Sequence, residues 1–255
     1  MALAILVTMR SKRGLSCGFV ALLLGLGVVW WPSLAAAQKK EEEAVKRTVA
    51  LFEARYRAAR TLQATFLERY LENLRLTRTE AGVAYFRRPG KMRWEYEEPE
   101  KNLFLVDGKW AWFYVPVDHT VTRAPAKQSS DWRTPLALLA GEMKVSRVCA
   151  RVEATTEEKP ENAQNVVLRC VLRGEDPKSA KEPAPQGDTV FFEIVRDTGE
   201  LVRIIVRQSG SVAIEFNFAN WVLDPVIPEA KFHFDPPRGV AIVNGEGPAD
   251  SPAKK

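Results

Sequence analysis

The acidic, histidine and cysteine side chains are the residues of this sequence that could carry out chemistry, and their spacing is unlike that of a catalytic site. Asp118 and His119 are a neighbouring acid and base, but no nucleophile motif accompanies them. The acidic run from Glu95 to Glu100 is typical of a solvated strand end rather than of a general acid and base. Because a glycine-rich phosphate loop is also missing from the sequence, we predict that the protein is not an enzyme.

The histidines and cysteines lack the spacing of metal ligands. His119 and His233 are the only two histidines, so we predict neither a metal nor another cofactor. Cys149 and Cys170 lie on two strand-like segments joined by a polar turn at residues 157–161. A hairpin centred on that turn would set the two cysteines opposite each other. They would then form either a disulfide, which export permits, or two buried thiols, and both alternatives are open.

The stretch from Val83 to Pro116 holds two strand patterns that are unusually rich in aromatic side chains. They surround Arg87-Arg88-Pro89-Gly90 and Val106-Asp107-Gly108-Lys109. A strand with one face in water would alternate more cleanly between polar and apolar residues. We therefore expect both faces of this sheet to meet apolar material. Such side chains either fill a dense core or line a cavity for an apolar ligand, and composition alone favours the core.

The first 37 residues have the pattern of a secretory signal peptide. A continuous apolar run, Gly18–Trp31, follows three basic residues and precedes an alanine triplet that ends at Ala37. The run is short for a bilayer span, so an uncleaved anchor is the weaker alternative. We expect a start at Met1 or Met9, cleavage near Ala37 and an exported, soluble mature chain. Removing the signal lowers the net charge from +5 to about +2, which argues against a nucleic-acid partner.

The remaining chain predicts a long helix followed mainly by strands. Apolar residues recur at helical spacing over Gln38–Arg60, and Thr134–Ala140 carries the start signals of a second, short helix. Alternating segments separated by turn residues predict eleven strands: Leu62–Leu71, Thr79–Arg87, Lys91–Tyr96, Asn102–Val106, Lys109–Val115, Met143–Val152, Val166–Leu172, Thr189–Val195, Leu201–Gln208, Val212–Phe218 and Lys231–Phe234. The predicted fold is mainly β (α+β), one large curved antiparallel sheet of about eleven strands with helices on one face.

Several blocks of the sequence resemble the LolA family, the periplasmic carriers of outer-membrane lipoproteins. They occur in the family's order over nearly the whole chain after the signal, and they are individually modest but specific together. The blocks are Leu62-Gln63-Ala64-Thr65-Phe66, Gly82–Pro89 with Trp94, Val106-Asp107-Gly108-Lys109, Trp112–Pro116, Thr134-Pro135-Leu136 with Leu139-Ala140, and Phe232–Val240. The section from Val145 to Gly187 matches the family poorly.

The resemblance implies an incomplete antiparallel β-barrel with a helical lid over a hydrophobic cavity. It implies that Arg88 latches the lid by donating hydrogen bonds to helix backbone carbonyls, a task that suits the donor fork of arginine. Trp94 matches a cavity tryptophan of the family, and Met92 stands where the family has phenylalanine. The predicted ligand-binding residues are Arg88, Met92, Trp94, Phe66, Tyr85, Trp112, Tyr114, Leu136 and Leu139.

The same resemblance implies a function, partners and a domain arrangement. A periplasmic, monomeric carrier would accept acylated lipoproteins from an inner-membrane lipoprotein-releasing ABC complex (LolCDE-like) and deliver them to an outer-membrane receptor (LolB-like). We expect a signal peptide at residues 1–37, a carrier half-barrel at 38–243 and a disordered tail at 244–255. The alternatives are a lipid-sensing envelope-stress regulator of the RseB type, which normally carries a second domain, and, less favoured, a periplasmic hydrolase.

Overall fold

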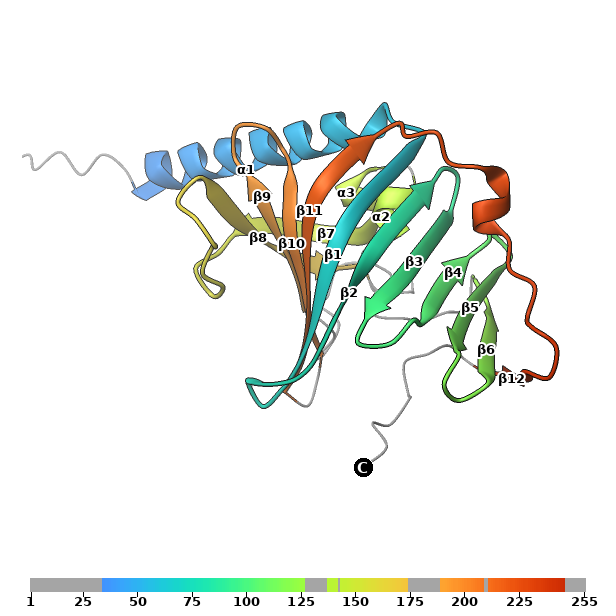
Figure 1. Ribbon diagram of the computed structural model, residues 1–255. Coiled ribbons are helices and arrows are strands. Elements are labelled where there is room, and N and C mark those ends of the chain that lie inside the picture. The colour runs from blue at the N-terminus through green and yellow to red at the C-terminus, as the bar shows by residue number, and fades with distance from the viewer. Residues whose placement is uncertain (1–33, 127–136, 142, 174–188, 209–210, 246–255) are drawn as a thin grey trace, which may run out of the picture.

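The computed structural model describes residues 34–126, 137–141, 143–173, 189–208 and 211–245. These residues form one large curved sheet with helices against it (Figure 1). Most of the predicted signal peptide, the residues Thr134 to Leu136, the loop at 174–187 and the tail from residue 246 lie outside the described residues.

Twelve strands make up the described sheet, in the order β12-β6-β5-β4-β3-β2-β1-β11-β10-β9-β8-β7. Neighbours pair antiparallel except at one edge, where β12 runs parallel to β6. The two edge strands do not pair with each other, so the sheet is open and does not close into a barrel. The strands are β1 (Thr61–Glu72), β2 (Arg75–Arg87), β3 (Lys91–Glu98), β4 (Leu103–Val106), β5 (Trp110–Val115), β6 (Thr120–Pro125), β7 (Cys149–Ala154), β8 (Asn165–Leu172), β9 (Thr189–Val195), β10 (Leu201–Gln208), β11 (Val212–Leu223) and β12 (Ala241–Asn244).

The predicted mainly β fold, with its curved sheet and few helices, is confirmed, with three differences in detail. Strands β6 and β12 were not expected, and because one predicted strand is absent from the described sheet, the sheet has twelve strands rather than eleven. The predicted strand Lys231–Phe234 is wrong, because Glu229–Phe232 forms the 3-10 turn η2. The predicted strand Met143–Val152 divides into the short helix α3 (Val145–Val148) and β7.

Helix α1 (Leu34–Arg57) lies along one face of the sheet (Figure 1). The expected apolar stripe is present, and its members Phe52 and Tyr56 are fully buried against the sheet. The helix rests closely on the β9–β10 turn: a Cβ on Gly199 would come within 2.4 Å of the Leu51 backbone. Gly199 also has a φ of +68°, a conformation that glycine adopts without steric cost. Arg55 forms an ion pair with Glu200 in the same turn.

The other two helices lie over the same face as α1. Helix α2 (Ala137–Ala140) packs on β2 and β3, and α3 leads directly into β7. The backbone N–H of Val145, at the start of α3, donates to the Glu53 carboxylate of α1 at 2.7 Å. This hydrogen bond joins the long helix to the α2–α3 segment. Among the described residues, no helix has both the length and the apolar character needed to span a membrane.

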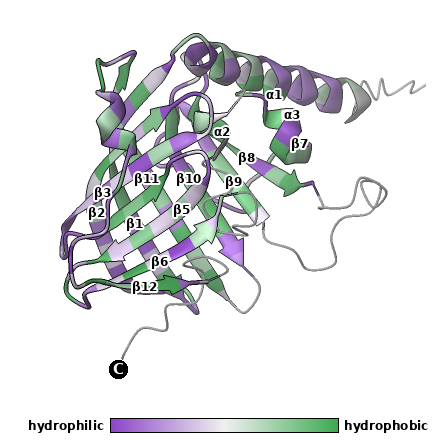
Figure 2. Cartoon of the chain, turned by 90° about the vertical axis from the view of Figure 1, so that its right-hand side faces the viewer, coloured by the Kyte–Doolittle hydropathy of each residue, from purple (hydrophilic) through white to green (hydrophobic). Residues whose placement is uncertain are grey.

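The two faces of the sheet bury different side chains. Hydrophobic and hydrophilic residues alternate along the central strands (Figure 2), and the buried positions of β1 to β3 recur every second residue. One set, which includes Phe86 and Trp94, packs against α1 and α2, and we call this face the inner face. The opposite, outer face carries two smaller clusters, one around Leu105, Trp112 and Val121 and one formed by Val167, Phe191 and Ile205.

A disulfide joins Cys149 to Cys170, which decides between the two alternatives that the sequence left open. Cys149 begins β7, the edge strand, and Cys170 lies in β8. The register places Cys149 opposite Leu172 and Cys170 opposite Val152, so the two cysteines are diagonal rather than direct cross-strand neighbours. The two Cα atoms are nevertheless only 5.4 Å apart. The disulfide fastens the edge strand β7, and with it the end of α3, to β8.

Candidate functional site

Arg88 connects the β2–β3 turn to the C-terminal end of α1. Its Nη1 donates to the carbonyl oxygens of Tyr56 at 2.6 Å and Arg57 at 3.0 Å, and also to that of Ala59. The last carbonyls of a helix have no partner within the helix and carry its partial negative charge. A guanidinium therefore satisfies them both as a donor and as a cation. The Arg88 backbone N–H adds a bond to the Arg60 carbonyl at 3.0 Å.

Burial has two consequences for the Arg88 side chain. It lowers the pKa of Arg88, an effect that the nearby charge of Asp224 partly opposes, although a guanidinium stays protonated in proteins. Burial also leaves the Nε and Nη2 atoms of Arg88 without hydrogen-bond partners within the described part of the chain. The Arg88 side chain therefore binds α1 through Nη1 alone, and among the described residues its Nε and Nη2 atoms remain as unpaired donors.

The same turn also holds α2. The backbone N–H of Gly90 donates to the carbonyl of Ala140, the last residue of α2, at 2.8 Å. Gly90 adopts a φ of +69°, which suits glycine. Two residues of one turn, Arg88 and Gly90, therefore hold the C-terminal ends of two helices. The resemblance implied that Arg88 donates to helix backbone carbonyls without saying of which helix; in the structure these carbonyls belong to the end of α1, and the bond with α2 is made by Gly90.

An aromatic cluster fills the space between the inner face and the helices. Trp94 is fully buried at its centre, with ring centroids 4.7 Å from Phe66, 5.9 Å from Phe86 and 5.4 Å from Phe216. Trp221 extends the cluster to α1, since its ring lies 5.0 Å from that of Tyr56. These rings form edge-to-face contacts that stabilise a dense interior.

Polar groups within this interior are few, and most of them are paired. The Tyr56 hydroxyl accepts a hydrogen bond from the Leu201 backbone N–H at 3.0 Å, and burial raises the pKa of Tyr56 to about 12. The Tyr96 hydroxyl donates to the Glu68 carboxylate at 2.8 Å. By contrast, the indole N–H of Trp94 has no hydrogen-bond partner among the described residues. The interior therefore offers mainly contact area to an apolar ligand, together with one donor.

The structure brings four of the predicted lining residues together and separates three from them. Phe66, Met92, Trp94 and Leu139 are buried in the inner cluster. Tyr85 lies on the outer face, where the Lys231 ammonium sits 4.5 Å from its ring centre. Trp112 and Tyr114 are also on the outer face, where both contact Phe234. Leu136 lies outside the described residues.

Sequence reasoning missed several members of the inner cluster. They are Phe86, Phe104, Phe113, Phe216, Phe218 and Trp221. The two-residue period was the available signal: if Trp94 faces inward, then Phe86 rather than Tyr85 does so on the paired strand, where Phe86 lies opposite Met92. On β5 the same rule selects Phe113 instead of Trp112 or Tyr114.

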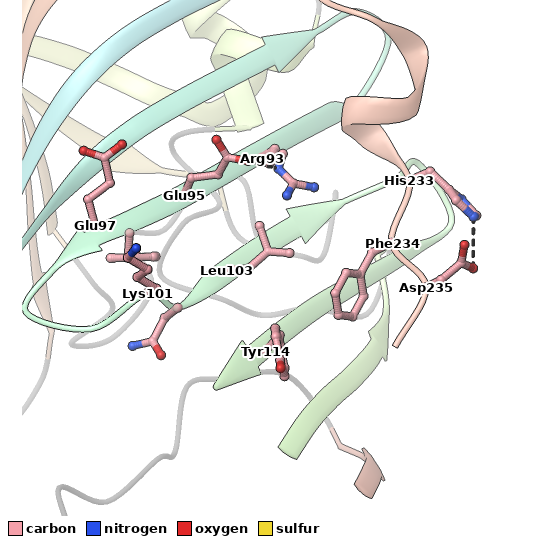
Figure 3. Close-up of a pocket in the computed structure, with 11 residues that line it drawn as sticks. Arg93, Glu95, Glu97, Lys101, Leu103, Tyr114, His233, Phe234 and Asp235 are labelled. Carbon is pink, nitrogen blue, oxygen red and sulfur yellow. Dashed lines mark hydrogen bonds and ion pairs between the residues drawn. The ribbon is translucent and has the colours of Figure 1, made fainter. Parts of the chain in front are cut away.

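A groove of about 500 Å³ lies on the outer face between β3, β5 and the segment that follows η2 (Figure 3). Leu103, Tyr114 and Phe234 form its apolar part. Glu95 and Arg93 lie beside it and bind each other, and Lys231 also binds Glu95 at 2.8 Å. Burial raises the pKa of Glu95, but the hydrogen bonds and charges of Lys231 and Arg93 outweigh this effect and leave it below its ordinary value. The charges around the groove are therefore largely paired.

The sheet, the inner cluster and the covering helices define a half-barrel whose aromatic interior is closed by helices held at one turn. Residues 57–169 match the family described as Outer membrane lipoprotein carrier protein LolA. The outer-membrane lipoprotein carrier protein of Nitrosomonas europaea is 31% identical over 192 residues, covering 72% of this chain and 83% of the relative. That of Nitrosospira multiformis is 28% identical over 200 residues, covering 73% and 83%.

This chain therefore belongs to the LolA family of outer-membrane lipoprotein carrier proteins, as the sequence blocks indicated. The assignment rests on the sequence matches. Among solved structures, a LolA superfamily protein from Nitrosomonas europaea is 10% identical, with coverage of 76% of this chain and 97% of that chain and a TM-score of 0.41.

Proposed function

We propose that this protein is an exported periplasmic carrier that binds the acyl chains of lipoproteins and delivers them to the outer membrane. In this proposal residues 1–37 are removed on export. An inner-membrane ATP-driven complex supplies the cargo, and an outer-membrane receptor takes it. Family membership supports the carrier role. The observation that carries the mechanism is the Arg88 contact, which closes α1 over the aromatic interior.

In this proposal the structure represents the closed carrier without cargo, in which side chains fill the interior. Ring-to-ring contacts around Trp94 leave its side chain fully buried. An acyl chain therefore enters only if inner side chains rotate and the helices move away from the sheet. Met92 is buried in the inner cluster, and methionine adapts its shape more readily than the aromatic residues around it.

The free energy of the Arg88 hydrogen bonds is small enough for the burial of acyl chains to open the carrier reversibly. A hydrogen bond from a charged donor contributes about 1.5–3 kcal/mol net, so the Arg88 bonds hold α1 by roughly 5 kcal/mol. Each buried CH₂ of an acyl chain contributes about 0.8 kcal/mol, so on the order of ten methylenes exceed that amount. Bound acyl chains would then hold the carrier open, and their departure would allow Arg88 to close it again.

The test is lipoprotein release and transfer in a reconstituted assay with Arg88→Leu. We expect this variant to stay folded and to be impaired in accepting or releasing cargo. Arg87→Leu is the matched control, because Arg87 binds the Ile227 carbonyl and Glu229 on the outer face and does not bind α1. Transfer at the wild-type rate by Arg88→Leu would contradict the latch.

A second experiment tests the carrier role itself. On depletion of the protein in its source cell, lipoproteins are expected to accumulate at the inner membrane. Mass spectrometry of the protein purified from the native envelope should find lipoprotein bound to it. Copurification of a free small lipid instead would assign the interior to another apolar cargo.

A further inference from the structure

The turn between β1 and β2 exposes two leucines at the end of a long hairpin. Glu72 pairs with Arg75, so Asn73 and Leu74 form a two-residue turn in which both have positive φ, 50° and 63°. Leu74 is 86% exposed and Leu76 is 57% exposed. Leucine rarely adopts this left-handed conformation, and glycine or asparagine would satisfy the turn at lower cost. The fold therefore does not explain the leucine at position 74.

Two arginines of β2 lie close to these leucines, and the exposed Glu72 lies opposite the first of them. Arg75, next to Leu74, is exposed. Arg78 stands three residues further along β2, with its guanidinium 5.4 Å from the centre of the Tyr70 ring and 3.2 Å from the Glu80 carboxylate. Arginine forms bidentate bonds with phosphate and can keep its aliphatic stem on apolar material. Leucines at the apex with arginines just behind them match the layers of a phospholipid surface, where acyl chains lie beneath phosphates.

The hairpin is firmly attached to the body of the sheet. The Asn73 backbone N–H donates to the Ser211 carbonyl at 2.9 Å, which fastens the turn to the start of β11. The tip lies at the lower end of the sheet in Figure 1. The Arg88 turn follows the opposite end of β2. A surface contact at the tip therefore leaves the helices and their latch free to move.

We propose that the β1–β2 tip, residues 71–78, is a docking site for anionic phospholipid surfaces, with Leu74 and Leu76 entering the headgroup layer. Protein partners need an interface of roughly 1,000 Å² or more, which one convex two-residue turn does not provide. A lipid surface is deformable, so its headgroups can surround and contact a small convex turn. Two leucines give weak, reversible attachment, which suits a carrier that must leave the membrane. The purpose of the contact rests on the proposed carrier function, whereas the contact itself does not.

The experiment is flotation of the purified protein with vesicles, in the absence of cargo. N-terminal processing is first checked by mass spectrometry. Vesicles of phosphatidylglycerol and phosphatidylethanolamine should bind the wild type at low salt, and pure phosphatidylcholine vesicles should bind it less. Leu74→Ser/Leu76→Ser should lower the binding by about tenfold, and raising the salt should weaken binding by the wild type. Both positions are exposed, so circular dichroism should show an unchanged fold.

Val117→Ser is the matched control, because Val117 is also an exposed apolar residue, at 67%, and lies in the β5–β6 turn. It should bind vesicles as the wild type does. Equal binding by the double leucine variant, or no wild-type binding to anionic vesicles at low salt, would overturn the lipid proposal. If the double leucine variant loses cargo transfer although the wild type does not bind vesicles, the tip would be assigned to a protein partner instead. Since the vesicle assay contains no lipoprotein, its outcome is independent of the Arg88 test.

Discussion

At the scale of single residues, neighbouring side chains with the same chemistry serve opposite faces of the sheet. Arg87 binds the segment at Ile227 and Glu229 on the outer face, whereas Arg88 binds the end of α1. The motif in the sequence predicted a helix contact for Arg88, but it could not tell which helix end would be near. That choice depends on where α1 stops after crossing the sheet, and therefore on tertiary packing.

Asp107 is a second residue whose role is set by its immediate neighbours. Its carboxylate accepts hydrogen bonds from the backbone N–H groups of Lys109 and Trp110, both at 2.7 Å, and from the Trp112 indole at 2.9 Å. Burial raises the pKa of Asp107, but these bonds and the charge of Lys91 outweigh the burial, and the net pKa is lowered from 3.8. The ionised form therefore stabilises the β4–β5 turn.

We predict that Asp107→Asn lowers the free energy of unfolding at pH 7. A carboxylate with a lowered folded-state pKa contributes stability above its unfolded pKa and loses that contribution as the pH falls through its folded pKa. The difference between wild type and variant should therefore shrink below about pH 4. Urea denaturation at pH 7 and pH 3 measures it. Asp118→Asn, an exposed change in the β5–β6 turn, is the control, and an Asp107→Asn effect of equal size at both pH values would contradict the assignment.

At the scale of elements, the sequence predicted best the strands that are both locally apolar and locally paired. Residues Thr189–Val195 and Leu201–Gln208 form strands at the predicted boundaries, because both are rich in β-branched residues and pair across a short turn. Strand β12 was missed because it pairs in parallel with β6, which lies more than a hundred residues earlier. A segment as short as Ala241–Asn244 shows no period of its own.

The error at Lys231–Phe234 has a different cause. Its Phe-x-Phe pattern is that of a strand, but Pro228 precedes η2 and two prolines follow Phe234. Proline cannot donate to a strand ladder, so this segment does not join the sheet as a strand. It is held to the sheet by its side chains and by the Lys231 carbonyl, which accepts a hydrogen bond from Arg93 at 3.0 Å. Phe232 is buried beneath Arg87, and Phe234 packs on Trp112 and Tyr114. The apolar residues were recognised correctly, and only the backbone conformation was mistaken.

The disulfide gives a prediction for the edge of the sheet. Replacing Cys149 and Cys170 by serine should lower the free energy of unfolding by about 3 kcal/mol, since the bond restrains the unfolded chain. The amides of β7 should then exchange with solvent sooner than those of β1 and β11 at the centre of the sheet, because β7 has a neighbour on one side only. Urea denaturation and hydrogen exchange test both statements. Reduction of the wild type should reproduce the effect, and an unchanged midpoint in both samples would refute it.

At the scale of the whole molecule, one sheet separates two aromatic clusters that the sequence treated as a single lining. The fold class followed from the alternation of short apolar segments and turns. The division between faces did not, because almost every residue around Trp112 is apolar, and each strand allows two choices of inward face. The pairing of strands across the sheet and the cover supplied by α1 decide the choice. Only the inner cluster lies beneath the helices, and only that cluster is proposed to meet cargo.

This separation can be tested with a quencher. Trp94 belongs to the inner cluster and Trp112 to the outer one, and both are nearly fully buried. A brominated fatty acid quenches tryptophan fluorescence only at close contact, so binding in the interior should quench Trp94 and leave Trp112 bright. Trp94→Phe should therefore reduce the bromine-dependent quenching to the part that comes from Trp221, the other described tryptophan of the inner cluster, whereas Trp112→Phe should retain the full effect. Both substitutions keep an aromatic ring and so limit the cavity that a smaller side chain would leave. Quenching that is lost with Trp112→Phe and kept with Trp94→Phe would move the acyl site to the outer groove and remove the helices and Arg88 from the carrier mechanism.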